Sequence, residues 1–593
     1  MAIRSSKTII GINEGINSSV VVMRDGVVAF ALQEERVNRI KEYIGFPHGA
    51  LELAMRQLRL DPSEVETVCF SNLRSPVTSR KRFYEYYEIS AKGIFERLCE
   101  GDWHALGRLA PSGVRDAVRR FLRKESASRH NKTVEGELVH HGLGGARIVR
   151  THHHLNHAAA AYFGCRENHT EPHLVFTLDG GGDDACAQVY IGKEGALKLI
   201  ASTPLGHSLG NVYSRVTMLM GMTPHEHEYK VMGLAAYASR EHCQPVIEVL
   251  SKIIDLDPES PLRFKRMVDE ETSHIIPRLE RELRRIRFDN IAGGLQFFTE
   301  DLLLKWIRAG IALTGIRKIV AGGGVFMNVK ANRLIAQLPE VEYFDVFPSC
   351  GDETLPFGAV WLEHARQSSS NGADIRFESI YLGPDGTHGL QRARQKFAAK
   401  VDFQVVDDPE QCTARLLAEG KIVARCSGRM EFGARALGNR SILADARDFG
   451  MIAKINKMIK QRDFWMPFAP AILAERAHEY VVIPKSLPKG RISPWMMHSF
   501  DTTTAGELFV AGLHQYDRST RAQVVSAQTA PEFYRLIKSY EALTGHGAVL
   551  NTSFNLHGFP IVLGAEDAIE VMLASGLDHL VIGDMLVTKR ASP

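Results

Sequence analysis

The chain has 593 residues, of which 45% are hydrophobic and 24% charged, and its formal net charge is +3. This length is too great for one hydrophobic core, so about two to four domains are expected. The small net charge argues against a general polyanion-binding surface.

The eight cysteines are scattered without a CxxC pair, which argues against a zinc ribbon and against a disulfide framework. The N-terminus, MAIRSSKTIIGIN, enters a strand pattern without a long apolar signal core. No apolar run reaches the roughly 18–20 residues of a membrane span. We therefore expect a soluble, cytoplasmic protein in a reducing environment.

Residues 7–36 alternate strand, turn and strand, with Asp25-Gly26 as the hairpin turn. A strand that enters a polar turn and returns by a hairpin is typical of actin-like, sugar-kinase-like ATPase domains. A helix is predicted at Pro47–Leu58 and a strand within residues 63–75. From about 76 to 147 the pattern is charged and helical. We interpret this segment as a solvated helical insert rather than a binding patch.

The stretch from Thr151 to Asp184 carries the first candidate site. It contains THHHLNHAAAAYFGC, in which His153 and His157 are four residues apart in a predicted helix. That spacing places both imidazoles on one face, close enough to share a metal ion. Residues 173–178 then form a predicted buried strand that ends in Asp179.

Three glycines follow Asp179, and their backbone can approach a phosphate closely. An HxxxH pair alone is more often packing than ligand, and glycine turns end many strands. The combination, in this order, favours a metal–nucleotide site.

Further along, GIRKIVAGGGVFMNVKANRLI predicts a strand, a triple glycine at Gly322–Gly324 and a helix, again suited to a nucleotide. Asp352 precedes another small-residue helix and is the natural last member of a metal set with His153, His157 and Asp179. Mixed His/Asp ligation suits iron or zinc better than magnesium.

A boundary is predicted in the polar, turn-rich segment 366–374. Beyond it, basic side chains concentrate among glycine, asparagine and serine, which suits a multiply anionic small ligand. The alternative is a surface ion-pair network, and the neighbouring apolar strands favour a concave basic pocket. The residues concerned are Arg429, Glu431, Arg435, Arg440, Lys457, Lys460, Arg462, Arg521, Asn551, Ser553 and Asn555.

Eight motifs occur in order along the chain: QEERVNRIK, HHLNHAAAAY, LDGGGDD, KVMGLAAY, GGGVFMN, GRMEFGARALGNRSILAD, MPFAPAIL and VLNTSFN. In these motifs the chain resembles the carbamoyltransferase family that includes NodU, CmcH and antibiotic O-carbamoyltransferases. The resemblance covers nearly the whole chain outside the insert.

The resemblance implies an α/β protein with an actin-like (ASKHA) metal domain at 1–370, interrupted by the insert at about 76–147. A YrdC-like domain would follow at 376–593. The implied C-terminal reaction uses carbamoyl phosphate and ATP, with magnesium, to make carbamoyl adenylate. A metal in the N-terminal domain, iron in relatives, would then support attack by an acceptor hydroxyl.

Carried over by motif, the metal ligands are His153, His157, Asp179 and Asp352. The N-terminal nucleotide site takes Gly180, Gly181, Gly182, Lys230, Gly323 and Asn328, with Lys41 near the carbamoyl adenylate. The C-terminal site takes Arg435, Arg440, Lys460, Arg521, Asn551 and Ser553. For the base that deprotonates the acceptor, His154 and Asn13 are the candidates.

Three departures from the family pattern stand out. Gly15-Ile16-Asn17-Ser18 replaces a His-Asp turn that faces the acceptor in relatives, Glu42 replaces a histidine and Met466 replaces an arginine. The acceptor can therefore differ, and an antibiotic, toxin, sugar or lipo-oligosaccharide hydroxyl all stay open, most of them in secondary metabolism.

The rival functions are an actin-like small-molecule kinase, a threonylcarbamoyl-type RNA modification enzyme, a hydrogenase maturation factor and an inactive scaffold. The kinase leaves the C-terminal basic residues unexplained, and the low net charge disfavours a nucleic-acid partner. The CxxC zinc sites and acylphosphatase domain of the maturation factor are not visible. No membrane partner is expected, and a homodimer is left open.

Overall fold

The structure is a computed structural model that describes residues 8–74 and 132–590. Most of the predicted insert at 76–147 therefore lies outside the described residues. Within the described part of that range the chain forms a helix at 132–140 and then enters a strand. No helix in the described parts of the chain is long and apolar enough to cross a membrane.

The first sheet has the strand order β3-β2-β1-β4-β5. Its first three strands are an antiparallel meander, while β1, β4 and β5 run parallel. The predicted hairpin turn is confirmed, because Asp25 and Gly26 both have positive φ, at 49° and 83°. The strands are β1 (Thr8–Asn13), β2 (Ser19–Arg24), β3 (Val27–Gln33), β4 (Val65–Phe70) and β5 (Arg147–Arg150).

Two helices accompany this sheet, α1 (Glu35–Asn38) and α2 (His48–Gln57), and the predicted helix at 47–58 is confirmed. The sequence analysis did not predict β5, whose first residue is the last of the predicted insert. The short RIVR segment of β5 is too brief and too exposed to show a strand pattern by itself.

A second sheet repeats the same plan, with the order β8-β7-β6-β11-β12 and an antiparallel meander followed by parallel strands. This duplication agrees with the predicted actin-like half. The strands are β6 (His173–Gly182), β7 (Ala185–Lys193), β8 (Ala196–Pro204), β11 (Lys318–Gly322) and β12 (Tyr343–Val346).

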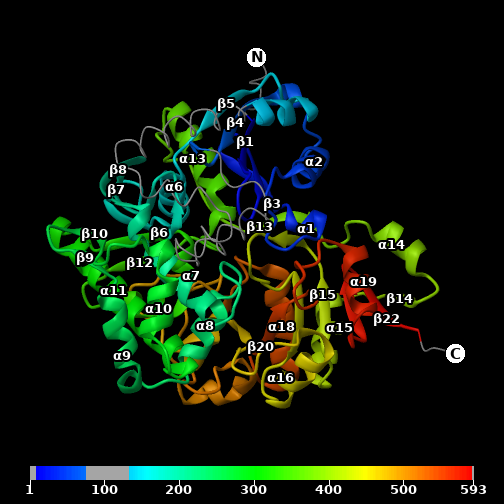
Figure 1. The fold of residues 1–593 in the computed structure, drawn as a ribbon. Coiled ribbons are helices and arrows are strands. Elements are labelled where there is room, and N and C mark those ends of the chain that lie inside the picture. Colours follow the sequence, from blue (N-terminus) through cyan, green and yellow to red (C-terminus); the bar gives the residue numbers. More distant parts are fainter. Residues whose placement is uncertain (1–7, 75–131, 591–593) are drawn as a thin grey trace, which may run out of the picture.

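Helices α6 (His153–Cys165) and α13 (Leu355–Gln367) pack on each other, α6 against the second sheet and α13 against the first. Their contact is close because Gly358 faces the α6 backbone. A Cβ there would lie 1.9 Å from the carbonyl oxygen of Asn156. Figure 1 shows the two helices between the sheets.

A helical layer covers the other side of the second sheet. It consists of α7 (Leu209–Leu219), α8 (Glu228–Ala235), α9 (Arg240–Ser251), α10 (Ile276–Glu282), α11 (Phe288–Thr314) and α12 (Val329–Ala336). The hairpin of β9 (Ile254–Asp257) and β10 (Ser260–Arg266) lies between α9 and α10 in the chain.

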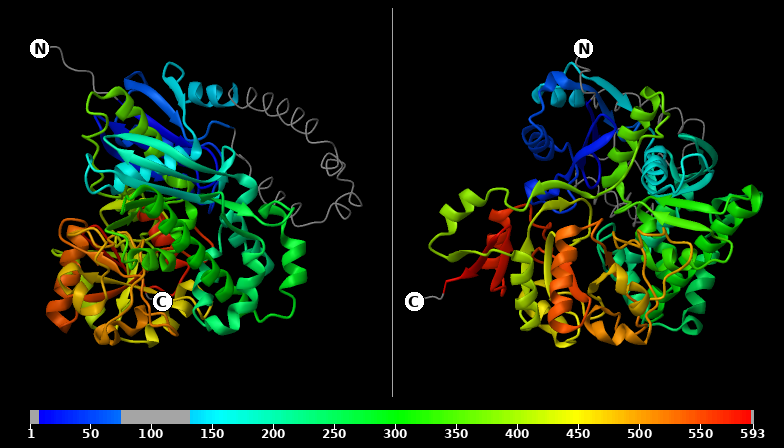
Figure 2. Two further views of the ribbon diagram at one scale, coloured as in Figure 1. Left: turned by 90° about the vertical axis from the view of Figure 1, so that its left-hand side faces the viewer. Right: turned by 180° about the vertical axis from the view of Figure 1, so that it is seen from behind.

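The rest of the chain builds an eight-stranded, mostly antiparallel sheet in the order β14-β22-β21-β15-β17-β20-β18-β19. The views in Figures 1 and 2 agree that it lies below the first sheet. Its strands are β14 (Val401–Val405), β15 (Val423–Cys426), β17 (Arg440–Asp445), β18 (Ala469–Leu473), β19 (Gln523–Val525), β20 (Ala548–Ser553), β21 (His579–Ile582) and β22 (Met585–Lys589).

A separate two-stranded ladder joins β13 (Tyr381–Asp385) to β16 (Arg429–Glu431). The helices of this half are α14 (Leu390–Phe397), α15 (Pro409–Ala418), α16 (Gly450–Ile455), α17 (Ala477–Tyr480), α18 (Pro531–Thr544) and α19 (Ala565–Leu573). A π-helical turn at Asn456–Lys460 follows α16.

The segment around 495–500 ties the two halves together. The Asn332 side chain donates to the Met497 carbonyl at 2.8 Å, and the Ser499 N–H donates to the Val329 carbonyl at 3.1 Å. Between them His498 is buried against the Phe344 ring, at 5.7 Å between centroids. Neither of its ring nitrogens has a hydrogen-bond partner.

This arrangement predicts that the contact between the two halves becomes less stable at low pH. Burial lowers the pKa of His498 from 6.5 to about 3, so folding favours the neutral ring. The stability it contributes is complete above pH 6.5 and is lost as the pH falls toward 3, at up to about 1.4 kcal/mol per pH unit. His498→Leu should therefore make the thermal unfolding midpoint fall less steeply between pH 6 and 4. Equal slopes for the variant and the parent chain would contradict this.

Candidate functional site

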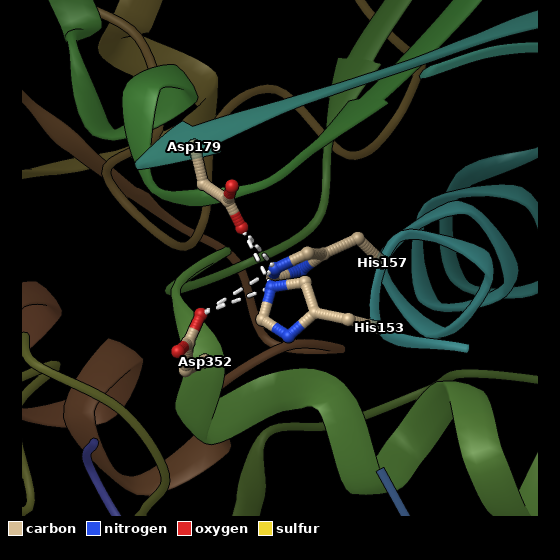
Figure 3. A group of neighbouring side chains, drawn as sticks. All are labelled: His153, His157, Asp179 and Asp352. Carbon is tan, nitrogen blue, oxygen red and sulfur yellow. Dashed lines mark hydrogen bonds and ion pairs between the residues drawn. The ribbon is translucent and has the colours of Figure 1, made fainter. Parts of the chain in front are cut away.

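The structure brings together the predicted metal set of His153, His157, Asp179 and Asp352, with one ligand atom of each lying within 4.8 Å of the others. Asp179 Oδ2 lies 2.7 Å from His153 Nε2 and 3.1 Å from His157 Nε2. Asp352 Oδ1 lies 3.6 Å and 3.5 Å from the same two nitrogens. Figure 3 shows both imidazoles leaving α6 toward the two carboxylates.

Local sequence explains why these groups meet. The helical spacing places both histidines on one face of α6. Asp179 lies near the carboxyl end of β6, the central strand of the second sheet. Asp352 begins the short 3-10 turn Asp352–Thr354 that leads into α13. Because α6 packs on α13, that turn is held opposite the histidines.

Hydrogen bonds orient His153 for ligation. Its Nδ1 lies 2.9 Å from Asn72 Oδ1, an acceptor, so Nδ1 carries a proton and Nε2 is the nitrogen that a metal would use once its own proton is displaced. Its backbone N–H donates to Asp183 Oδ2 at 2.9 Å. Asn72 follows β4 and is far away in sequence, so sequence reasoning missed it.

The electrostatics of the set match a cation site. Burial opposes the charge of Asp179, but the neighbouring histidines outweigh it and hold its pKa well below the usual range. Burial also opposes protonation of His157, but Asp179 and Asp352 raise its pKa to about 9. A metal must therefore displace protons that these carboxylates otherwise hold in place.

The donor set fits a metal ion. Asp179 Oδ1 is buried without a hydrogen-bond partner, since the nearest nitrogen, His154 Nε2 at 3.4 Å, lies closer to the Ala185 carbonyl oxygen, at 3.1 Å. Two imidazole nitrogens with two carboxylate oxygens suit a borderline ion such as iron or zinc.

The predicted glycines have a packing role at this site. A Cβ on Gly182 would lie 2.3 Å from Cγ of His153. Gly323 has a φ of 95°, and a Cβ there would lie 2.4 Å from the Leu178 carbonyl oxygen. The close approach of protein groups thus accounts for these two glycines, and a phosphate cradle at Gly180–Gly182 and Gly323 stays a prediction.

Both candidates for the base need correction. His154 is fully buried, its ring nitrogens face Thr177 Oγ1 and the Ala185 carbonyl, and burial lowers its pKa to about 3. It cannot reach an acceptor hydroxyl. Asn13 is an amide with no useful basicity, and its Nδ2 donates to the carbonyls of Ile16 and Asp352. Its role is to hold the turn after β1 against the site.

The other predicted N-terminal residues pair with groups other than the four ligands. Lys41 forms an ion pair with Glu226; burial opposes its charge, but that partner raises its pKa. Lys230 pairs with Asp463 at 3.1 Å. Asn328 exchanges two amide hydrogen bonds with Gln296, both 2.9 Å, and caps α12, so its part in nucleotide binding stays a prediction.

In the C-terminal half, Lys460, Arg435 and Arg521 lie in one group of neighbouring cations together with Arg462. Lys460 is 3% exposed, and its Nζ donates to Ser553 Oγ at 3.1 Å and to Asn555 Oδ1 at 2.7 Å. Burial lowers its pKa well below the usual range, and the charge of Arg462 adds to this. We call Arg435, Lys460, Arg462 and Arg521 the cation cluster.

Two members of the cation cluster, Arg435 and Arg521, have no hydrogen bond or ion pair with any described residue, and the Nε of each is buried. Burial lowers the pKa of Arg521 well below normal, and the charges of Arg435 and Arg462 lower it further. Mutually repelling cations, two of which have no ion pair or hydrogen bond with a described residue, indicate a site whose counter-charge comes at least in part from a ligand.

Arg440 differs from its neighbours and corrects the prediction that it binds phosphate. It is fully buried, and its guanidinium donates only to backbone carbonyls. The acceptors, at 2.8 to 3.2 Å, are Pro384, Ser427, Gly428, Asn439 and Leu563. Asn551 also has a supporting role, because its Nδ2 holds the Ala436 carbonyl at 3.2 Å, next to Arg435.

Sequence reasoning also missed Tyr229 and Glu353. The charge of an ionised Tyr229, on α8, would raise the pKa values of Arg435, Arg462 and Arg521, so this N-terminal side chain faces the cation cluster. Glu353 is buried beside Asp352, and burial raises its pKa to about 7. Tyr229 precedes Lys230 and Glu353 follows Asp352 in the sequence. This proximity to predicted site residues is the only sequence signal for them.

The contact between Gly182 and His153 predicts a specific loss. Gly182→Ala should push the His153 ring aside and weaken Fe²⁺ binding about 10–100-fold, as measured by anaerobic equilibrium dialysis. Gly180→Ala is the matched control, because a Cβ there meets its nearest neighbour at an ordinary 3.6 Å. Equal affinities for the two variants would show that this close approach does not orient the ligand.

Comparison with known proteins supports the family. Residues 8–361 match the model of the carbamoyltransferase N-terminus and residues 414–589 that of the carbamoyltransferase C-terminus. Nodulation protein NolNO of Sinorhizobium fredii is 27% identical over 97% of this chain and 80% of its own length. Nodulation protein NolO of Bradyrhizobium diazoefficiens is 29% identical over 74% of this chain and 79% of its own.

Among solved structures, full-length HypF in its phosphate- and nucleotide-bound form aligns over 62% of this chain and 47% of its own. Its identity is 12% and its TM-score 0.30, which is too low to support an inference. The two family models together span most of the chain and confirm the resemblance seen in the motifs. The chain belongs to the carbamoyltransferase family and is a carbamoyltransferase.

Proposed function

We propose that the protein is an ATP-dependent O-carbamoyltransferase with two reaction centres. Residues 376–593, as a YrdC-like unit, would form carbamoyl adenylate from carbamoyl phosphate and ATP. Residues 1–370, as an actin-like unit, would transfer the carbamoyl group to a hydroxyl of a small-molecule acceptor. The membership of the family supports carbamoyl transfer, and the cation cluster supports the use of a phosphorylated donor.

The observation that carries the proposal is the cation cluster, in which neither Arg435 nor Arg521 forms an ion pair with a described carboxylate. Arg435 and Arg521 are half-buried, and unpaired guanidinium groups in such places are costly unless an anion joins them. Arg435 and Arg521 offer planar donors that match phosphate oxygens, while Lys460 supplies a point charge. Carbamoyl phosphate and the ATP phosphates are anions of this kind.

In the first half-reaction, water hydrolyses carbamoyl phosphate to phosphate and carbamate. A carbamate oxygen then attacks the α-phosphorus of ATP, and pyrophosphate departs. In the second half-reaction the acceptor oxygen attacks the carbamoyl carbon and AMP leaves. The cation cluster would neutralise charge on the transferring phosphates, which is the main contribution that a protein makes to such a step.

At the N-terminal centre His153, His157, Asp179 and Asp352 would hold a divalent metal, for which we propose Fe(II). Such an ion polarises a carbonyl and stabilises the negative charge that develops when a hydroxyl attacks it. The chain itself positions the ligands: Asn72 fixes the tautomer of His153, and Asn13 holds the Asp352 turn. The acceptor would be a hydroxyl-bearing natural product.

The proposal predicts that carbamoyl phosphate triggers pyrophosphate release from ATP. Lys460→Ala should reduce that release about 100-fold, because a buried charge-assisted contact to phosphate is lost. Pyrophosphate is measured with purified full-length protein, Mg²⁺ and ATP, with and without carbamoyl phosphate.

Lys457→Ala is the matched control, since Lys457 is three residues earlier and exposed. It should behave like the parent chain. ADP formation that does not depend on carbamoyl phosphate would favour a kinase instead, and equal rates for the two lysine variants would remove the cation cluster from the reaction.

A further inference from the structure

A second group of metal-ligating side chains lies outside both proposed reaction centres. Glu52 on α2 and His140 and His141 at the end of the helix 132–140 each place one ligand atom within 4.8 Å of the others. Glu52 and His140 are exposed and His141 is half-buried, so a dissolved ion can reach them.

Neighbouring side chains hold these groups in place. His48 Nδ1 lies 3.0 Å from His141 Nε2, which is hydrogen-bond distance. The other nitrogen of His48 lies 3.6 Å from a Glu137 carboxylate oxygen. The buried Phe46 ring stacks on the His141 ring with 15° between their planes. Hydrogen-bonded and stacked imidazoles of this kind are the usual support of a metal-binding histidine.

The chemistry of the group points to a particular class of ion. Two imidazoles and one carboxylate suit a borderline divalent ion such as zinc, whereas calcium and magnesium prefer oxygen ligands throughout. The fourth position of a tetrahedral site would be left to water or to His48.

We propose that Glu52, His140 and His141 form a second cation site for Zn²⁺ or a similar divalent transition ion. The site would clamp α2 to the end of the helix 132–140, two elements that are distant in sequence and both pack beside the first sheet. Its role would be structural, because it shares no residue with the four-ligand group or with the cation cluster. The inference stands whether or not the proposed function is correct.

The test is equilibrium dialysis of the full-length chain, free of any histidine tag and stripped of metal, against buffered Zn²⁺. Total zinc is measured in the parent chain, in His140→Ala/His141→Ala and in His153→Ala/His157→Ala. His478→Ala is the control, because it removes an exposed histidine from α17. The substituted residues of the proposed site lie at the surface, so the double variant should fold.

We expect about two zinc ions on the parent chain and on the control, and about one on each double variant. Zn²⁺ should also raise the thermal unfolding midpoint of His153→Ala/His157→Ala, since an ion that binds only the folded chain stabilises it. Glu52→Gln should weaken this second site at least about tenfold. Equal zinc on the parent chain and on His140→Ala/His141→Ala, with the same unfolding midpoints in zinc, would overturn the proposal.

Discussion

The N-terminal centre depends on one carboxylate. Asp179, near the end of β6, lies 2.7 and 3.1 Å from two imidazoles of α6, and all three side chains are buried. In such surroundings an ionised carboxylate is stable only when cations or strong donors face it. Close packing brings the imidazoles to this carboxylate. Gly182 leaves room for the His153 ring, and Gly323 lets the end of β11 pass beside Leu178.

The two halves must also keep a fixed position relative to each other, and α8 contacts the C-terminal half. Lys230 pairs with Asp463, and Trp465 Nε1 donates to the Lys230 carbonyl at 3.2 Å. Met466 packs on Gly233, and its sulfur would lie 3.1 Å from a Cβ added to that glycine. The same helix carries Tyr229 toward the cation cluster. Met466 thus contributes packing rather than charge where the two halves meet.

Much of the metal group could be predicted from local sequence. The spacing of His153 and His157 and a strand that ends in Asp179 are short-range patterns with direct geometric consequences. Asn72 could not be predicted, because it reaches His153 only through the pairing of separate elements. In the C-terminal half, sequence could not separate Arg435 from Arg440. Both occur in one glycine-rich stretch of sequence, yet only the fold shows that backbone carbonyl oxygens surround the Arg440 guanidinium, at the start of β17.

In the proposed reaction, carbamoyl adenylate forms at one site and is used at another. The most direct test is mass spectrometry of carbamoyl adenylate in reactions of the parent chain and of His157→Ala, each with ATP, Mg²⁺ and carbamoyl phosphate. Our account predicts that His157→Ala still makes carbamoyl adenylate, because the cation cluster is intact, and that the compound accumulates. Absence of carbamoyl adenylate from a folded His157→Ala protein would contradict the separation of the two sites.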